Sequence, residues 1–406
     1  TAGAVVQTDC ASSPTAACDA TAGAAARLAS AGDAFGNTVI AALWTSDVDS
    51  ELSDNPVAPS YAGAVTLAPV LVAPTGGNAG TLGTTNLSLV AGTGAVAAQQ
   101  WTQSGALRIN ASGTYLAQNV VGQSAVLARF SPHHLETVLT THGCGNFTYS
   151  AQPITALTIR AMDGATTSAL TPNYKGSFAR TVTVTDGNGS TSGTFSANVI
   201  PAAGFASGSA LASPVFSFTS PTSAPLTLKL RAADAEVSSA GYAEASEEIR
   251  SGRVQLSNAN GSELLNLPLD LRLQYWASAA LGWQNNAQDT CTLINASDFA
   301  FAFPGAGNTL AACETAITIG GAVPNYTATL TRPGAGNSGW TDITLNLDTL
   351  ASGNRCTALG PGGPAATTVN SPWLRYNWKG ILGNPSARAT FGVYKSGPII
   401  HRREMY

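Results

Sequence analysis

Four carboxylates that lie close together in the sequence most directly suggest chemistry. Asp47, Asp49, Glu51 and Asp54 alternate with small and polar residues, and alternating carboxylates can supply the oxygen ligands that Ca²⁺ prefers. The stretch lacks the glycine and the distal glutamate of an EF-hand loop, so a solvated acidic loop is the competing interpretation. We therefore expect at most a weak calcium site here, and the sequence implies no other cofactor.

Histidines form a second cluster with ligand chemistry. His133, His134 and His142 fall within a short stretch ahead of Cys144, and neutral imidazoles are common metal ligands. No H-E-x-x-H helix accompanies them. Polar loop histidines beside a disulfide are therefore the favoured interpretation.

Motifs for catalysis are missing from the sequence. It contains no G-x-S-x-G nucleophile elbow and no phosphate-binding P-loop. A G-x-G-x-x-G pattern at 334–339 stands between two strand-like runs without a helix to receive a pyrophosphate, so we interpret it as a hairpin loop. Glu136, Glu263 and Asp270 could act as glycosidase carboxylates only if the fold brought a pair together. We expect a protein that is not an enzyme.

The cysteines indicate the redox compartment in which the protein resides. The six residues are even in number, form no C-x-x-C and fit no zinc spacing, which predicts three disulfides formed in an oxidising compartment. Proximity in the sequence favours Cys10–Cys18 and Cys291–Cys313, which would leave Cys144 to pair with Cys356. The alternative is a set of buried free thiols.

The elements that position these residues are predicted to be strands. Polar and apolar residues alternate through most of the chain, interrupted by turn-forming Gly, Asn, Asp and Pro. Hairpins are predicted from 180–185 to 190–200, from 253–256 to 263–276 and from 326–331 to 340–347. In the strand at 387–394 we expect the odd-numbered side chains to be buried.

Helical patterns are scarce, and they do not alter the fold class. Residues 20–31 could form one alanine-rich helix, whereas 235–249 contain helix-forming residues without an apolar stripe. Short strands at regular spacing predict an all-β fold of tandem, immunoglobulin-like β-sandwich modules with few short helices, stabilised by disulfides. We place the modules at 1–130, 131–234 and 235–406.

Charge and hydropathy exclude two classes of partner. The net charge is −4, and nucleic-acid binding requires a basic surface that displaces counterions. No apolar run is long enough to predict a transmembrane segment. Charged residues make up only 10% of the chain, against roughly 25% in ordinary soluble domains. Sparse charge weakens the repulsion between copies, so self-association is an expected form of binding.

The order of several blocks resembles a known family. Residues 128–136, Cys144 and 147–153 are followed by the blocks at 253–264, and the chain closes on P-W-L-R-Y-N-W at 372–378 and N-P-S-A-R-A-T-F-G-V-Y at 384–394. This order resembles the C-terminal region of MshQ-like proteins, which are associated with mannose-sensitive haemagglutinin (type IV) pilus systems of Gram-negative bacteria. The likeness is strong from about residue 128 onward.

The resemblance implies an exported protein of the cell surface or pilus, with no catalytic residues. Its partners would be pilus or surface proteins or further copies of itself; a glycan receptor would be possible, but no lectin-like jelly roll is visible in this chain. We therefore expect a role in adhesion or in the architecture of a surface appendage. A self-assembling extracellular fibre subunit is the first alternative, and a secreted carbohydrate-active enzyme is the second.

Overall fold

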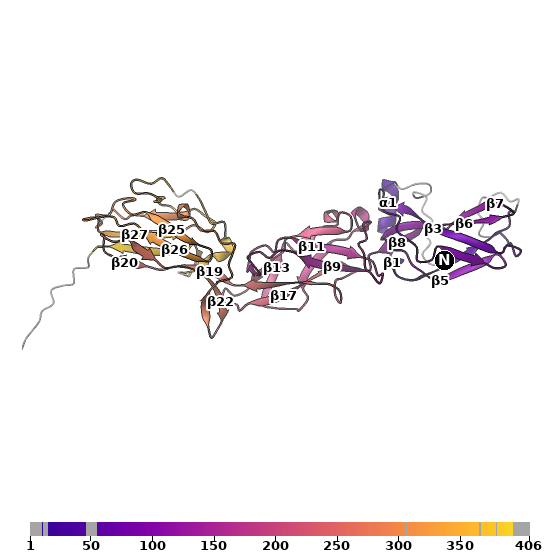
Figure 1. Cartoon of the computed structure of the whole chain (residues 1–406), viewed down its shortest axis with the longest axis horizontal. Helices are drawn as coiled ribbons and strands as arrows, with labels where there is room; N and C mark the ends of the chain where they lie inside the picture. Colours follow the sequence, from indigo (N-terminus) through magenta and orange to yellow (C-terminus); the bar gives the residue numbers. More distant parts are fainter. Residues whose placement is uncertain are drawn as a thin grey trace, which may run out of the picture.

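The computed structural model describes residues 10, 15–45, 55–305, 307–364, 367–378 and 380–392. Three β modules follow one another along the long axis of the molecule (Figure 1). Apolar side chains from facing sheets fill a core in each module, so the predicted tandem β-sandwich fold is confirmed.

The first module has one large sheet and a small one. The large sheet has the order β1-β8-β6-β3-β4, with β7 on β6, and β2 pairs with β5 in the small sheet. The bounds are α1 Ala16–Ala24, β1 Ala29–Ser30, β2 Phe35–Ile40, β3 Gly63–Ala73, β4 Asn86–Leu89, β5 Thr93–Gln99, β6 Gly105–Tyr115, β7 Gln118–Gln123 and β8 Leu127–Ser131.

The second module has three sheets, with the orders β10-β18-β17-β12-β14, β15-β11-β9 and β13-β16. The bounds are β9 His134–Leu139, β10 Thr148–Tyr149, β11 Leu157–Met162, η2 Gly176–Phe178, β12 Val182–Asp186, β13 Gly193–Ser196, β14 Val199–Ile200, η3 Ala202–Gly204, β15 Ser209–Ala212, β16 Val215–Phe218, β17 Leu226–Ala233 and β18 Ala245–Arg250.

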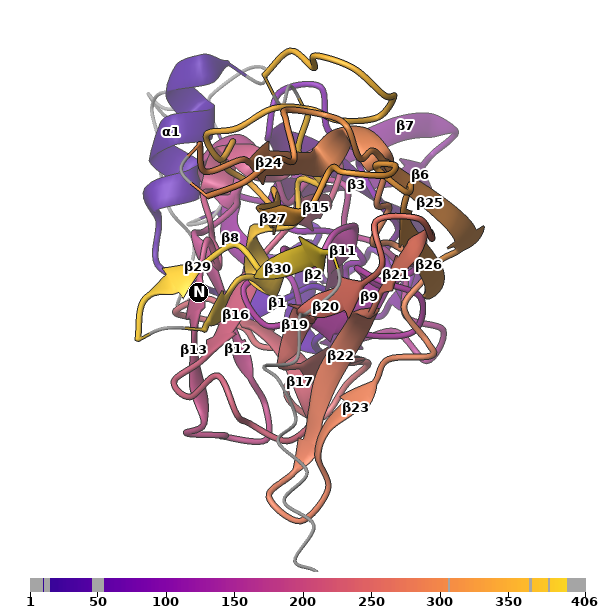
Figure 2. The same ribbon diagram turned by 90° about the vertical axis from the view of Figure 1, so that its left-hand side faces the viewer.

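The third module combines the sheets β19-β22-β23, β20-β30-β27-β24, β21-β26-β25 and β28-β29 (Figure 2). The bounds are β19 Gly252–Leu256, β20 Ala259–Gly261, β21 Leu267–Leu269, β22 Leu271–Ser278, β23 Gly282–Asn285, η4 Ala296–Asp298, β24 Phe299–Ala302, β25 Ile317–Ala322, β26 Asn325–Leu330, β27 Gly339–Leu345, η5 Pro372–Leu374, β28 Tyr376–Asn377, β29 Leu382–Gly383 and β30 Ser386–Phe391.

Alternating side chains explain the strands that carry the cores. In β17, Leu228, Leu230 and Ala232 are buried while the residues between them are partly exposed, as expected where one face of a sheet packs on a core. In β30, Ala387, Ala389 and Phe391 are all buried, so the odd-numbered face is the inner one over the described part of that strand.

The predicted hairpins differ from the observed pairing. β19 pairs with β22, as expected for the second hairpin. In the first hairpin, β12 pairs with β14, whereas the intervening β13 joins a separate sheet. The third is wrong: β26 pairs with β21 and β25, and β27 pairs with β24 and β30. A turn signal predicts a reversal of the chain but does not choose the sheet that the next strand joins.

The one expected helix is also shifted. The helix of the first module is α1, and residues 29–30 form β1, not the end of that helix. Residues 235–249, which contain helix-forming residues without an apolar stripe, include residues 245–249 of β18, which pairs with β17. This strand lies beyond the expected module boundary at 234, and it completes the sheet of the second module.

Candidate functional site: the junctions between modules

The junction between the second and third modules begins as an almost uninterrupted strand. β18 ends at Arg250 and β19 begins at Gly252, so only Ser251 separates the sheets of the two modules. A side chain at position 252 would not fit, because a Cβ there would lie 2.3 Å from the Tyr149 ring. Glycine therefore lets the strand pass directly against a buried aromatic residue of the second module.

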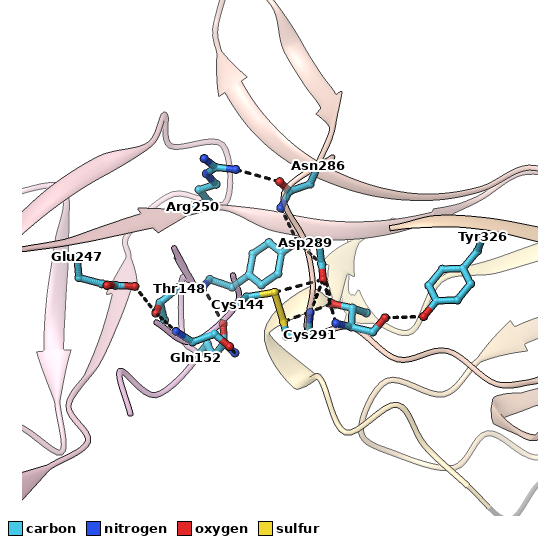
Figure 3. The surroundings of a disulfide bond; sticks show 12 residues. Cys144, Thr148, Gln152, Glu247, Arg250, Asn286, Asp289, Cys291 and Tyr326 are labelled. Carbon is cyan, nitrogen blue, oxygen red and sulfur yellow. Dashed lines mark hydrogen bonds between the residues drawn. A yellow bond between two sulfur atoms is a disulfide. The ribbon is translucent and has the colours of Figure 1, made fainter. Parts of the chain in front are cut away.

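A disulfide joins the same two modules. Cys144 lies between β9 and β10, and Cys291 follows β23, 147 residues later in the chain. Figure 3 shows this bond between the two modules, surrounded by polar side chains of both. A cross-link of such long range restricts the unfolded chain and also ties the modules at a point away from the connecting strand.

Asp289 organises the polar network around the disulfide. Its carboxylate is fully buried and accepts hydrogen bonds from the Tyr149 hydroxyl (2.7 Å), the Thr292 hydroxyl (2.7 Å) and the backbone N–H groups of Cys291 (3.0 Å) and Thr292 (2.9 Å). Burial and then the Asp289 charge raise the pKa of Tyr149 well above its ordinary value. Tyr149 therefore remains a hydrogen-bond donor to the carboxylate across the junction.

Arg250 joins the same hydrogen-bond network through Asn286. Its Nη1 donates to Asn286 Oδ1 (2.9 Å), and Asn286 in turn donates to the Tyr149 hydroxyl (2.7 Å). The guanidinium lies 4.4 Å from the ring centroid of Phe147 in the second module and 4.9 Å from that of Tyr275 in the third. One cation therefore contacts aromatic rings of both modules.

The chemistry of this site is cross-linking. Among the described residues, Cys144, Asp289 and Cys291 are close enough together to suggest a metal site. However, the two sulfur atoms are bonded to each other, so neither is a thiolate ligand, and the Asp289 oxygens already accept four hydrogen bonds. The possible ligand atoms at this site are therefore already bonded within the protein, and the arrangement joins two domains.

The first junction is fixed by helix packing. The N-terminal disulfide Cys10–Cys18 attaches to α1, and Phe178 of the second module is buried in the same apolar cluster as these cysteines. Ser177 Oγ donates to the carbonyl of Asp19 (2.6 Å), and Arg180 Nη2 donates to that of Gly23 (2.8 Å). The first and second modules therefore share a small core and the polar contacts around it.

An ion pair supports the same junction. Arg129, which is almost fully buried in β8, donates two hydrogen bonds to the carboxylate of Glu236 in the second module. Those hydrogen bonds lower the pKa of Glu236. Asn78 and Asn173 add a reciprocal pair across the junction, with bonds of 2.7 and 2.8 Å. Paired in this way, the buried charge of Arg129 is satisfied.

The structure describes only some of the residues that the sequence suggested for chemistry. Asp47, Asp49, Glu51 and Asp54 lie outside the described residues, so the calcium hypothesis stays a prediction. Glu136 lies in β9 of the second module, whereas Glu263 and Asp270 lie in the third. The carboxylate of Asp270 accepts a hydrogen bond from Arg272 (2.6 Å).

Two of the three histidines lie together and the third lies apart. His133 Nε2 lies 3.7 Å from the carboxylate of Asp33 across the first junction. The ring of His134 is buried and stacks on Tyr242, with centroids 3.7 Å apart. His142 contacts Glu247 near the second junction. His133 and His134 also contact each other, with their Nδ1 atoms 3.1 Å apart and both rings against Tyr242, whereas His142 lies apart from this pair.

Two of the three expected cysteine pairs are wrong. Cys10–Cys18 is present, but Cys291 bonds to Cys144 and Cys313 bonds to Cys356. The physical reason is the strand that crosses the junction, which brings the segment after β23 next to the segment before β10. Cys313 and Cys356 instead close a loop within the third module. Free cysteines are absent, as predicted for an oxidising compartment.

Sequence reasoning missed an aromatic cluster around Arg253. Its guanidinium lies 4.2 Å from the ring centroid of Trp283, 5.1 Å from Tyr376 and 4.8 Å from Trp378. Burial lowers the pKa of Arg253, and the Tyr376 hydroxyl opposes that shift. The rings come from β23 and from the β28–β29 region, so the cation joins two hairpins of one module. Spacing alone could not reveal this contact.

Arg375 and Arg388, near the C-terminal end of the described chain, have carboxylate partners. Arg375 Nη1 donates to Asp348 (3.0 Å), and Arg388 Nε donates to Asp342 (2.8 Å). Trp373 is partly buried and packs against the core of the third module. Tyr394 lies outside the described residues.

Comparison with known families assigns the chain. Residues 2–103 match the second domain of DUF6701, residues 103–248 the third and residues 250–405 the fourth. The chain therefore belongs to the DUF6701 family and carries these domains in order. The boundary near 250 coincides with the change from β18 to β19, whereas β6, β7 and β8 belong structurally to the first module.

Solved structures give only distant likenesses. The I-band fragment I67–I69 from titin is 9% identical, with 90% of this chain and 94% of that chain covered and a TM-score of 0.23. The surface layer protein SbsC, domains 4–9, is 11% identical, with 86% of this chain and 41% of that chain covered and a TM-score of 0.18. The eight N-terminal Ig domains of DSCAM are 10% identical, with 90% of this chain and 40% of that chain covered and a TM-score of 0.26. Scores this low carry no functional argument.

Two further findings complete the comparison. No curated protein matches the chain. Over the described residues, no helix has the length and apolar character needed to cross a membrane. The three disulfides indicate a protein exported to an oxidising compartment.

Proposed function

We propose that the chain is a rigid stalk segment of an exported bacterial surface protein, and that it acts in adhesion or in the architecture of a surface appendage. The observation that carries this proposal is the second junction, where a disulfide, a buried carboxylate network and a nearly continuous strand all connect neighbouring modules. Modules joined by a flexible linker would need none of these contacts, because relative motion is the usual state of such pairs.

The resemblance to MshQ-like proteins supports a pilus-associated, Gram-negative setting for this stalk. A stalk transmits position and force, which requires fixed angles between modules but no catalytic group. The proposal is accordingly non-enzymatic, with pilus or surface proteins as partners and no resident cofactor.

A functional test uses a bacterium that produces the protein. A strain carrying Cys144→Ser together with Cys291→Ser is compared with the wild type for surface labelling with antibody and for attachment under flow. We expect equal surface labelling and reduced attachment as shear rises, because the stalk has become flexible. A strain with Cys313→Ser and Cys356→Ser is the matched control, since that bond lies within one module. Absence of the protein from the surface, or attachment that depends equally on both bonds, would refute the stalk function.

A further inference from the structure

Strand β7 extends from the first module without covering any core. All six residues of Gln118–Gln123 are exposed, so neither face of the strand packs on another layer. It pairs only with the distal half of β6 and lies at the end of the module that is remote from the second module (Figure 1). On its other side β6 pairs with β3 over residues 110–113, so β7 is the outermost strand of the large sheet, and a further strand on its outer edge would add backbone hydrogen bonds there.

The outer edge of β7 presents unpaired backbone groups. Ser124 N–H donates to the carbonyl of Ile109 in β6 (2.9 Å). Along an antiparallel strand, the backbone N–H and C=O groups of successive residues point alternately toward one neighbouring strand and away from it. The backbone groups of Gln118, Val120 and Gly122 therefore face β6. Those of Asn119, Val121 and Gln123 face outward, and among the described residues no strand pairs with this edge.

Natural edges are usually protected by charge, proline or a bulge, and this one is not. No Asp, Glu, Lys or Arg occurs from residue 109 to 128, and the side chain of Val121 is 70% exposed. The turn residues Leu116 and Ala117 have φ values of 49° and 63°, a conformation that non-glycine residues adopt at a cost. Leu116 is 81% exposed at this turn. Strain and exposed apolar side chains therefore coincide at one hairpin.

We propose that β7 pairs antiparallel with β7 of a second copy of this chain, forming a two-fold symmetric dimer. In the register centred on Val121, this residue faces its own counterpart, and Asn119 faces Gln123 of the other copy. Every outward N–H and C=O of these three residues then finds a partner. Both edges are uncharged, so no like charges oppose the pairing.

A second copy fits this edge because the edge is self-complementary in charge and in register. The sheet would continue from β6 and β7 of one copy into β7 and β6 of the other. Because the contact is isologous, it closes after two copies and does not propagate into a fibre. The paired strands are short, so the dimer is weak and forms only at high protein concentration.

Sedimentation equilibrium over a wide concentration range tests the pairing in the full chain. We expect the wild type to dimerise reversibly and Val121→Pro to raise the Kd at least about tenfold. Proline removes an N–H that faces outward, so the β6–β7 pairing is retained, and an unchanged melting temperature checks this. Val121→Thr keeps the N–H and is the matched control, with a Kd within about twofold of the wild type.

Two results would overturn the proposal. One is a wild-type protein that stays monomeric at every concentration. The other is a dimer whose Kd is unchanged by Val121→Pro, which would place the contact elsewhere on the chain. The dimer goes beyond the stalk function, and its failure would leave the stiffness of the junctions untouched.

Discussion

Asp289 shows how one buried side chain can couple two domains. It is fully buried, and its oxygens satisfy a phenol, a hydroxyl and two backbone N–H groups at the second junction. Because a donor left unsatisfied in the interior costs about 1–3 kcal/mol, we expect Asp289→Ala to lower the free energy of unfolding by about 3 kcal/mol or more.

Urea unfolding measures this effect, with Asp270→Ala as the control. Asp270 pairs with Arg272 on the exposed surface, where ion pairs contribute about 1 kcal/mol or less. Equal destabilisation by the two substitutions would contradict the role assigned to the Asp289 network.

Glu244 makes the second module sensitive to acid. Burial would raise the pKa of its carboxyl, but hydrogen bonds from Arg231, Ser239 and Lys229 outweigh burial and hold the pKa at about 2. A carboxyl whose pKa is depressed in the folded state stabilises that state above its unfolded pKa. This stability is lost as the pH falls from about 4.5 to about 2.

A pH series of Glu244→Gln tests that reasoning. At neutral pH the variant should be less stable than the wild type, and the difference should shrink steadily below about pH 4.5. Thermal melting at several pH values measures it. A difference that stays constant down to pH 2 would show that the ionised form of Glu244 contributes no stability.

The cysteine pairs define separate elements of the fold. Cys144–Cys291 joins two modules, whereas Cys313–Cys356 lies within the third. Loss of either should cost about 2–5 kcal/mol, but only loss of the first should uncouple the modules. We expect calorimetry of Cys144→Ser with Cys291→Ser to show the second and third modules melting in separate transitions, with a single shifted transition for Cys313→Ser with Cys356→Ser. The reverse pattern would contradict the interpretation of the junction.

The sequence correctly predicted features that depend on residues close together in the chain. Alternation along 387–391 identified the buried face that carries Phe391, and the cysteine count identified the compartment. It failed at partner choice, because the sheet that β27 joins depends on strands far away in the chain. Asp289 left no signal at all, since an isolated aspartate among polar residues resembles any surface carboxylate.

At the scale of the whole molecule, two differently built junctions hold three modules in line. The first uses a shared apolar cluster and the ion pair between buried Arg129 and partly exposed Glu236. The second uses a disulfide and the Asp289 network. Neighbouring domains with ordinary interfaces usually move relative to each other. The contacts at these two junctions should restrict that motion and make the molecule stiff. We therefore expect the chain to behave as one rod.

Small-angle X-ray scattering measures that property most directly. We predict that the full chain scatters as a single extended rod, with a maximum dimension that stays the same as the temperature rises toward the melting point. Combining Asp289→Ala with Cys144→Ser and Cys291→Ser should shorten the average dimension and produce the scattering of modules that move independently. Wild-type scattering typical of flexibly linked modules, indistinguishable from that of the triple variant, would contradict the account.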